Sequence, residues 1–407
     1  MKKYILLLLL FTSCGFIEKY QDSNIQMIKI YQGMTTIPPM AFFEDLVTSD
    51  ISIPKIFHTS RFKSEKVDFD KYNIVKIQAI EAVFTKTTEF LKKYPNAKVE
   101  IHIQIFLNCF DYGKLLKLIP KDRIESIHLY DDGTEDYINL YQWKSNSELE
   151  EFLAIEDKKT ENFFKTGSSS ISEHRYSLEK VYPWQVVQHM LRPDYLDLSI
   201  NGNKLDPIKN RITSNITIDF ENMSKILTTE QKQLYFDLIG FEQKVIKDLY
   251  DNSPNPNFAL TGTTIWSTDL IERNFFADQH INIFKNLIEP TKYLNKYFNG
   301  KQYNFFFKLH PRGDEINDKI VATFPDYYRL PDTAGYESLI VSGLIPKKTG
   351  GILSSLYFSL PKDKISFLVF KGSRAEAQED SLVQVMKELD IIQDSQLYFW
   401  DELNNTL

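Results

Sequence analysis

Residues 124–133 read Ile-Glu-Ser-Ile-His-Leu-Tyr-Asp-Asp-Gly, in which seven residues run directly into two acidic residues and a glycine. The first seven predict a strand. Residues 99–107 alternate apolar and polar side chains and predict a neighbouring strand. Asp131, Asp132 and Gly133 therefore follow the carboxyl end of a strand. In open α/β sheets the ligand crevice lies outside those ends.

Helical and strand patterns alternate along the rest of the chain. Apolar residues recur at three- or four-residue spacing from 76 to 94, which predicts an amphipathic helix that Pro95 ends. Further strands are predicted at 257–261, 304–309 and 365–370. This alternation of strands and helices in both halves of the chain predicts two facing Rossmann-like α/β domains with a cleft between them.

The middle of the chain, about 138–229, is polar and helix-leaning, and we place the domain linker in its first half. The whole chain has 407 residues, of which 43% are hydrophobic, enough for more than one buried core. Its 48 Lys and Arg against 55 Asp and Glu give a net charge of −7. Such a balance lacks the excess of positive charge that binds a phosphate backbone, so nucleic acid is not an expected partner.

The first residues have the pattern of an export signal. Lys2 and Lys3 precede an apolar run, 4–11, that is too short to span a bilayer. It ends in Phe-Thr-Ser-Cys-Gly at 11–15, which resembles the lipobox of bacterial lipoproteins, with Phe11 in place of the usual Leu. We expect residues 1–13 to be a signal peptide and Cys14 to be acylated. An ordinary cleaved signal or an uncleaved anchor is the alternative. The only other cysteine is Cys109, so a lipidated chain has no intramolecular disulfide.

The Asp-Asp-Gly segment has two interpretations. Gly133 permits a sharp turn, so one of the preceding carboxylates can face a cleft and act as a base. Asp and Gly are also common in simple turns after a strand. Adjacent side chains at a strand end point in opposite directions, which disfavours joint binding of a metal ion by Asp131 and Asp132.

Two further segments contain residue types that can bind a phosphate group or donate a proton to it. His310 stands between Lys308 and Arg312 just after a strand, where it can donate a proton to a departing phosphate oxygen, or simply form a structural hydrogen bond. Residues 349–355 contain a glycine pair followed by Ser354 and Ser355. Backbone amides and hydroxyls at a helix start bind phosphate, although a turn with an N-cap explains the same residues.

Other candidate chemistries find little support. Trp266 can be a platform for the apolar face of a sugar ring or a core residue. The histidines lack metal-ligand spacing, so no metal site is assigned. A Gly-x-Ser-x-Gly elbow typical of serine hydrolases is absent from the sequence.

Taken together, three segments in the same order and spacing resemble bacterial sialyltransferases of glycosyltransferase family 80. They are Tyr-Asp-Asp-Gly at 130–133, Lys-Leu-His-Pro-Arg-Gly-Asp-Glu-Ile-Asn at 308–317 and Ser-Ser-Leu-Tyr-Phe-Ser-Leu-Pro at 354–361. Further matches occur at 60–62, 258–266, 391–396 and 399–400. The resemblance covers nearly the whole mature chain.

The resemblance implies a GT-B fold with a deep central cleft. The expected acceptor-side domain comprises 25–162 with 386–407, and the expected donor-binding domain comprises 163–385. The implied activity is an inverting, metal-independent transfer of sialic acid from CMP-sialic acid to a galactose-terminated glycan, with the α2,3 or α2,6 linkage left open. No cofactor is implied.

Carried over position by position, the resemblance implies that Asp132 is the general base and that His310 assists departure of CMP. Donor contacts are implied for Lys308, Pro311, Glu337, Ser354 and Ser355, and acceptor contacts for Arg61, Trp266 and Arg312. The sequence departs from the family at Leu309, where glycine is frequent. Near 107–109 we find no match to a donor-contacting histidine of some relatives.

These expectations extend to partners and motion. The chain is expected to be a monomer in the bacterial cell envelope, held to a membrane by its lipid. Asp132 and His310 lie in different halves of the chain, so we expect donor binding to close the domains and build the acceptor site. The alternatives are a GT-B enzyme that uses another nucleotide sugar and, less favoured, a solute-binding lipoprotein.

Overall fold

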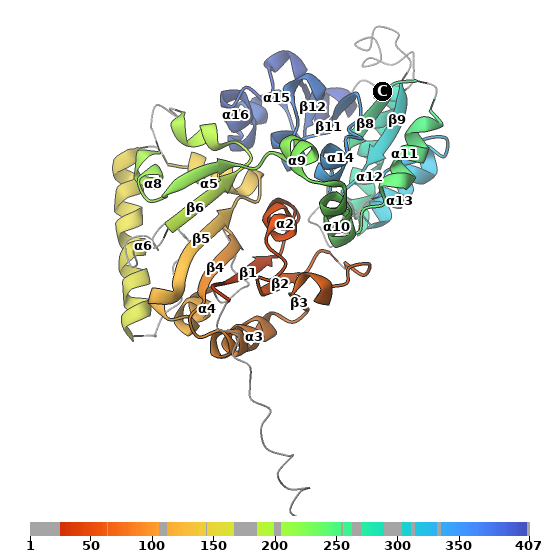
Figure 1. Cartoon of the computed structure of the whole chain (residues 1–407). Coiled ribbons are helices and arrows are strands. Elements are labelled where there is room, and N and C mark those ends of the chain that lie inside the picture. Colours follow the sequence, from red (N-terminus) through yellow and green to blue (C-terminus); the bar gives the residue numbers. More distant parts are fainter. Residues whose placement is uncertain are drawn as a thin grey trace, which may run out of the picture.

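The structure is a computed structural model that describes residues 25–404 apart from ten short gaps (Figure 1). The gaps are residues 63, 106–111, 144, 167–184, 199–204, 254, 263–269, 289–302, 311–313 and 332–334. Within the described part, no helix is both long enough and apolar enough to cross a membrane.

The first domain is built on a seven-stranded sheet with the order β3-β2-β1-β4-β5-β6-β7, in which every pairing is parallel. Its strands are β1 (Met27–Gly33), β2 (Lys55–Thr59), β3 (Ile74–Ile77), β4 (Lys98–Gln104), β5 (Ile124–Tyr130), β6 (Gln185–Met190) and β7 (Ser214–Thr217).

The second domain is built on a six-stranded parallel sheet with the order β10-β9-β8-β11-β12-β13. Its strands are β8 (Asn257–Thr261), β9 (Asn304–Lys308), β10 (Tyr328–Arg329), β11 (Lys348–Ile352), β12 (Ile365–Phe370) and β13 (Leu397–Phe399).

Both sheets have the doubly wound strand order. The chain builds outward from β1 in one direction to β3 and then returns to continue with β4 on the other side, and it repeats this path from β8 to β10 and β11. The two switch points therefore lie between β1 and β4 and between β8 and β11. Ligands of such sheets bind outside the carboxyl ends of the strands at these points. The two predicted Rossmann-like domains are present.

Helices connect the strands in both domains. The first part of the chain contributes α2 (Ile37–Thr48), α3 (Ile80–Lys93), α4 (Tyr112–Leu118), α5 (Thr134–Tyr141), α6 (Asn146–Thr166), α8 (Asp206–Lys209), α9 (Phe220–Ile226), α10 (Thr229–Ile239) and α11 (Gln243–Asp251). The second part contributes α12 (Leu270–Ile288), α13 (Asp314–Thr323), α14 (Glu337–Ser342), α15 (Arg374–Glu379), α16 (Ser381–Glu388) and α17 (Trp400–Asn404). Short 3₁₀ turns include η1 (Asp70–Tyr72), η2 (Lys121–Arg123), η4 (Pro193–Asp197), η6 (Ser355–Phe358), η7 (Lys362–Lys364) and η8 (Asp394–Gln396).

The expected domain boundaries need correction. Strands β6 and β7 pair within the first sheet, so the first domain extends well beyond residue 162. Strand β13 pairs with β12, so the end of the chain belongs to the second sheet and not to the first. The polar composition of the middle segment concealed these strands, since β7 is an edge strand of four residues that buries no side chain. Near the end of the chain, helix α16 packs back against α5 of the first domain.

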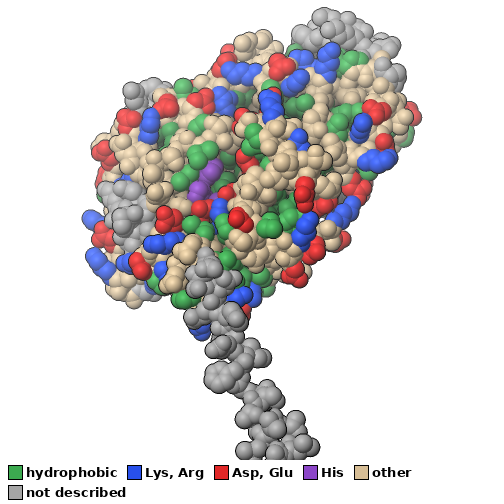
Figure 2. Space-filling view, viewed as in Figure 1, with side chains coloured by type: hydrophobic (Ala, Val, Ile, Leu, Met, Phe, Trp, Pro, Cys, Tyr) green, Lys and Arg blue, Asp and Glu red, His purple; other side chains and the backbone are tan. Residues whose placement is uncertain are grey.

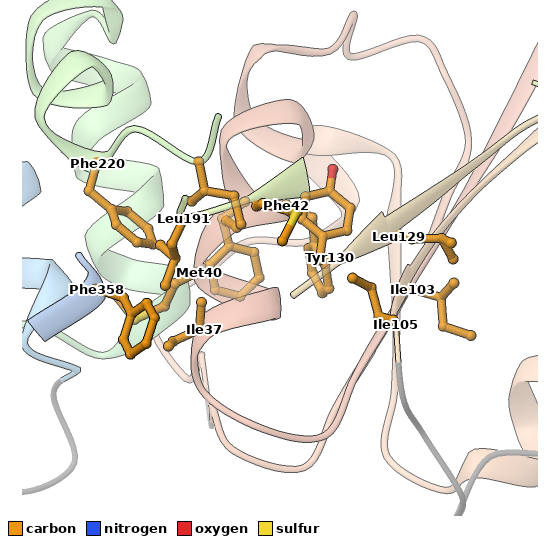
Figure 3. Packing of buried hydrophobic residues seen from close by; sticks show 14 of the residues in the cluster. Ile37, Met40, Phe42, Ile103, Ile105, Leu129, Tyr130, Leu191, Phe220 and Phe358 are labelled. Atoms are coloured by element: carbon orange, nitrogen blue, oxygen red, sulfur yellow. The ribbon is translucent and has the colours of Figure 1, made fainter. Parts of the chain in front are cut away.

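A continuous apolar core crosses from one domain to the other. Phe358 of η6 belongs to the same buried cluster as the sheet residues of the first domain. Its ring stacks on Tyr137 of α5 with centroids 4.6 Å apart. Figure 3 shows Phe358 in this cluster together with Ile37 of α2 and Phe220 of α9. Burial of this ring therefore joins the turn after β11 to the helix that follows β5.

Candidate functional site

The predicted site residues lie where strands end, at the edge where the two sheets face each other. Arg61 follows β2, Asp132 follows β5, His310 follows β9 and Ser354 follows β11. One pocket brings six of the predicted residues together from both domains. It is lined by Arg61, Lys308, His310, Glu337, Ser354 and Ser355, with Thr36, Ile37, Gly262, Leu309, Gly335, Tyr336 and Leu356.

Asp131 is a structural residue. Its side chain is completely buried and accepts hydrogen bonds from the Tyr137 hydroxyl at 2.7 Å and from the backbone N–H groups of Gly133 and Leu191 at 3.2 and 2.8 Å. Burial raises the pKa of this carboxyl to about 6, although the three hydrogen bonds act in the opposite direction. The first acid of the pair therefore holds the loop together.

Asp132 is partly exposed and is oriented by its neighbours. Its backbone N–H donates to Asp136 Oδ2 at 2.6 Å, and its Oδ2 accepts from Gln104 Nε2 at 3.3 Å. Two donors, the Met34 N–H and the Thr35 hydroxyl, contact Gln104 Oε1 at 3.3 and 3.2 Å. These two donors fix the Gln104 amide oxygen on the side of Met34 and Thr35. The Gln104 amide nitrogen is therefore directed to the Asp132 carboxylate.

Gly133 connects this loop to the second domain. A Cβ atom placed on Gly133 would lie 3.0 Å from Cβ of Ser355 and 3.1 Å from Cδ1 of Ile37. The residue also has φ of +82°, a conformation that side chains disfavour. A glycine here lets the Asp132 loop approach Ser354 and Ser355, which follow a strand of the other sheet.

The position of Ser354 and Ser355 depends on a close approach of the two strands β11 and β8. Gly351 in β11 has φ of +130°, and a Cβ there would lie 2.5 Å from the carbonyl oxygen of Thr261 in β8. Ser354 precedes η6 but its side chain does not cap that turn. Within the described part of the chain, neither Ser354 nor Ser355 uses its hydroxyl in a hydrogen bond. Both hydroxyls border the pocket and are available to an anionic ligand.

The segment after β9 supplies cationic and imidazole groups. Lys308 is buried, and its ammonium donates to the Leu309 carbonyl at 3.1 Å. The backbone oxygen of His310 accepts from Asn317 Nδ2 at 2.8 Å, which fixes the turn while the imidazole remains partly exposed. Leu309, the departure from the family pattern, is buried, and a Cβ on Gly262 would lie 3.1 Å from its Cδ2. The glycine at 262 therefore makes room for this larger side chain.

Glu337 lies at the start of α14 with its carboxyl in the pocket. It is 4% exposed and accepts a hydrogen bond from Ser359 Oγ at 3.2 Å. Burial raises the pKa of this carboxyl, and Lys308 opposes the shift. A buried carboxyl at this place can accept hydrogen bonds from the hydroxyls or amines of a ligand.

Four predicted residues, Pro311, Arg312, Trp266 and Cys14, lie outside the described residues. So does the 107–109 segment, where a donor-contacting histidine was sought. The structure therefore gives no position for these side chains.

Sequence reasoning missed three residues that position the predicted site, namely Gln104, Asp136 and Tyr137. The sequence offered no distinct signal for Gln104, because it is one of the regularly spaced polar residues of the alternating strand β4. Asp136 and Tyr137 lie in the first turns of α5 and form hydrogen bonds with Asp132 and Asp131. These contacts exist only in the folded loop, so the sequence does not show them.

One group of described residues has metal-ligand composition. Ligand atoms of Glu100, His102 and His128 lie within 4.8 Å of one another on strands β4 and β5, and His102 is 1% exposed. On the face drawn in Figure 2, Lys and Arg side chains are interspersed with those of Asp and Glu. The rings of His102 and His128 stack with planes 17° apart, so a metal in the plane of both rings would require them to rotate. The ammonium of Lys29 already contacts Glu100 at 2.8 Å. We assign no metal to this group.

Comparison with known proteins decides the family. The profile of the sialyltransferase PMO188 family matches residues 28–395. The chain belongs to this sialyltransferase family. It is therefore a glycosyltransferase rather than a solute-binding lipoprotein. A search of curated proteins found no match.

Solved structures agree with this assignment. This sialyltransferase is 29% identical to one from Photobacterium damsela, with 92% of this chain and 81% of that chain covered and a TM-score of 0.77. The GT-B domain of a Photobacterium damselae sialyltransferase is 28% identical over 92% of this chain and 100% of that chain, with a TM-score of 0.79. A 2,6-sialyltransferase of Photobacterium sp. JT-ISH-224, in a ternary complex with CMP and lactose, is 25% identical over 92% and 78%, with a TM-score of 0.79. The predicted GT-B fold is confirmed.

Proposed function

We propose that this sialyltransferase moves sialic acid from CMP-sialic acid to the galactose of an acceptor glycan, with Asp132 as the base and His310 as the acid. The observation that carries the proposal is the contact between Gly133 and Ser355. It places the carboxylate loop of one domain against the hydroxyls of the other, beside one pocket that His310 also lines. A related enzyme whose complex holds CMP and lactose supports this choice of donor and acceptor.

The proposed reaction is a single displacement. The acceptor hydroxyl oxygen attacks the anomeric carbon of sialic acid, and its proton passes to the Asp132 carboxylate. The bond from the anomeric carbon to the phosphate oxygen breaks, and the electron pair leaves with CMP, to which His310 gives a proton. A base and an acid on opposite faces of the sugar give inversion, by analogy with inverting glycosidases.

Groups of the protein can stabilise the departing phosphate. The Ser354 and Ser355 hydroxyls can donate to its oxygens, and the buried Lys308 places a positive charge in the same pocket. Glu337 is proposed to hold the nucleotide. Arg61, on the opposite wall, is proposed to contact the acceptor, together with Trp266 and Arg312; Pro311 is assigned to the donor side. A metal ion is not part of this proposal.

The decisive experiment is transfer from CMP-sialic acid to lactose in the presence of EDTA, followed by mass. We expect sialyllactose from the wild-type chain, and losses of about 10²- to 10⁴-fold in Asp132→Asn and His310→Gln, the range for acid–base groups. Asp363→Asn, an exposed acid remote from the pocket, is the matched control and should keep full activity. Activity that requires an added metal ion would overturn the metal-independent mechanism. Transfer from another nucleotide sugar, but not from CMP-sialic acid, would support the alternative donor.

We also propose that Cys14 carries a lipid that holds the enzyme in the bacterial cell envelope, and that the enzyme acts as a monomer. The support for the lipid is the sequence around Cys14 and the short apolar run before it. The support for the monomer is that both walls of the pocket come from one chain. Mass spectrometry of the membrane-extracted chain tests the first, with Cys14→Ser as control. Sedimentation of the leaderless chain tests the second.

A further inference from the structure

Exposed lysines lie along one edge of the first domain, the edge where its strands begin. Lys92 and Lys93 end α3, Lys98 begins β4, Lys117 lies in the last turn of α4 and Lys121 precedes β5. All five are exposed. We call these five residues the basic edge. Helices that lead into parallel strands end at this side of a sheet, opposite the side where the ligand crevice lies.

Four of the five lysines of the basic edge are not paired with a carboxylate of the described residues. Among the described residues, Lys92, Lys93, Lys98 and Lys117 form no ion pair. Several exposed lysines on other surfaces pair with carboxylates, namely Lys66 with Glu242, Lys71 with Glu230, Lys165 with Glu161, Lys225 with Glu221 and Lys244 with Asp248. Other exposed lysines, such as Lys158, Lys247 and Lys347, also lack an ion pair among the described residues, but they do not gather at one edge of a sheet.

Acidic side chains are sparse at this edge. The only described acid between residues 92 and 121 is Glu100, which points inward to Lys29 and His102. Asp122 and Glu125 follow as exposed acids and leave an excess of lysines. Arg123 adds a further cation there, and its guanidinium donates to backbone carbonyls of Leu91, Tyr94 and Ala97.

Aromatic rings lie beneath several of these ammonium groups. The Lys117 ammonium is 3.8 Å from the ring centroid of Phe163, and that of Lys93 is 5.0 Å from that of Tyr94. Lys121 lies 5.9 Å from the Phe164 centroid. Such contacts support the aliphatic stems on apolar surface while the charged ends remain in solvent.

The chain enters the fold at the same edge. The Lys98 N–H donates to the Gln26 carbonyl at 2.9 Å, and Met27 is paired with Lys98 in the sheet. Ile25, the first described residue, is only 11 positions after Cys14. Fully extended, that length spans at most about 40 Å. A lipid on Cys14 would therefore keep the basic edge close to the membrane surface.

We propose that the basic edge rests on a bilayer surface of anionic phospholipid, with the catalytic cleft directed away from it. Figure 1 shows α3 and α4 at the end of the first domain remote from α15 and α16 of the second domain. The orientation rests on the lipid proposed for Cys14, whereas the affinity of the edge for anionic lipid does not. Acceptors would then be glycans that reach the cleft from outside the lipid headgroup layer.

Vesicle flotation of the chain starting at Gly15 tests the surface without the lipid anchor. Vesicles contain phosphatidylglycerol and phosphatidylcholine in one sample and phosphatidylcholine alone in the other, at low and high salt. We expect flotation with the anionic vesicles only, and its loss at high salt because screening weakens such attraction.

The test variant is the triple Lys92→Gln, Lys93→Gln, Lys98→Gln. Its matched control is Lys225→Gln, Lys244→Gln, Lys247→Gln, which removes the same charge from exposed residues of α9 and α11. We expect the edge triple to lower the vesicle partition coefficient by roughly 10- to 100-fold, since each basic residue near such a surface accounts for about fivefold. The control triple should lower the vesicle partition coefficient much less.

Equal losses in both triples, or equal flotation with uncharged vesicles, would overturn the proposed surface. So would an absence of flotation with anionic vesicles at low salt. Transfer to lactose is measured on the same samples and should be unchanged in both triples, because neither set lines the pocket. Failure of the membrane surface is thereby distinguished from failure of the proposed reaction.

Discussion

At the scale of single residues, the adjacent acids Asp131 and Asp132 have different roles because their side chains enter different environments. Asp131 is completely buried and accepts three hydrogen bonds, whereas Asp132 is partly exposed. The alternation of side chains at a strand end produces this division. The sequence alone indicated that the two side chains diverge but gave no structural role to Asp131.

We expect the same substitution to have opposite consequences at these two positions. Asp131→Asn places an amide N–H₂ against at least one hydrogen-bond donor, so the free energy of unfolding should fall by about 1–3 kcal/mol. Asp132→Asn should change that free energy by less than about 0.5 kcal/mol and yet lose transfer. Urea unfolding and the lactose assay measure the two effects. A strongly destabilised Asp132→Asn protein would contradict the division of roles.

Gln104 is a positioning residue for Asp132. Its amide donates to Oδ2 of the carboxylate while its own oxygen is fixed by the loop that leads from β1 to α2. A hydrogen bond to the charged form of a carboxyl lowers its pKa. The acid limb of the pH–rate profile should therefore depend on this amide.

Gln104→Glu removes the donor, keeps the shape and adds negative charge beside Asp132. We expect kcat/KM for the acceptor to fall by about 10- to 100-fold and the acid limb to move to higher pH, because the pKa of Asp132 rises. Gln104→Met removes the donor without the charge and should shift the limb less. The Kd for CMP should stay within about twofold, since Gln104 does not line the pocket. An unmoved pH profile would show that Gln104 is only structural.

At the scale of elements, the sequence predicted the strands that carry the chemistry. The ranges expected for β5, β8 and β12 match the structure at both ends, because turn residues bound each segment. The expected helix at 76–94 is shorter, Ile80–Lys93, because its first residues belong to β3. Local patterns cannot show such competition between neighbouring elements.

Interior strands as well as edge strands were missed, since β1, β2, β6 and β11 were not predicted from the sequence. The contacts between distant segments were missed as well. Strand β7 has no apolar run, and only pairing with β6 reveals it. Residues 349–355 were interpreted as a turn or a helix start, but both glycines lie in β11, where Gly351 allows the close approach to Thr261. The chemistry at strand ends was predictable, whereas the tertiary contacts that orient it were not.

Strands β4, β5 and β6 form a row of histidines across the sheet. His102 and His128 stack with centroids 4.4 Å apart, and His128 Nδ1 lies 2.9 Å from His189 Nε2. Burial, followed by the neighbouring histidines, lowers the pKa of His128 and of His189 to about 3. Both rings are therefore neutral at physiological pH.

This row should make the protein less stable in acid. A histidine whose pKa is lower in the folded state binds more protons when unfolded, so stability falls as the pH drops below about 6.5 toward 3. Between pH 7.5 and 5, we expect each ring to cost on the order of 1–2 kcal/mol. The raised pKa of Asp131 acts in the opposite direction below about pH 6, and offsets part of the loss. Urea unfolding at several pH values measures the combined effect of these groups on the free energy of unfolding.

The double variant His128→Gln, His189→Gln is the comparison. It lacks both titrating rings, so its stability should vary less between pH 7.5 and 5 than that of the wild-type chain. If the two proteins show the same pH dependence, the row does not control acid stability.

At the scale of the whole molecule, the site exists only where the two domains meet. Thr36, Ile37 and Arg61 form one wall of the pocket, and Lys308, Glu337 and the paired serines form the other. The stacking of Phe358 on Tyr137 ties the serine turn to the helix beside Asp131. A ligand that fills the pocket contacts both walls, so it binds best to the arrangement in which the walls are close.

We therefore expect CMP to favour the arrangement described here. Without nucleotide, the small-angle X-ray scattering profile should include a population more open than the structure. Saturating CMP should bring the profile to the one expected for the structure itself. AMP at the same concentration is the control, because the proposed donor is a cytidine nucleotide. Ser354→Ala, Ser355→Ala should weaken the response to CMP, since it removes hydroxyls proposed to contact the phosphate. A profile that CMP leaves unchanged would mean that the domains are already closed, and that the acceptor site is complete before the donor arrives.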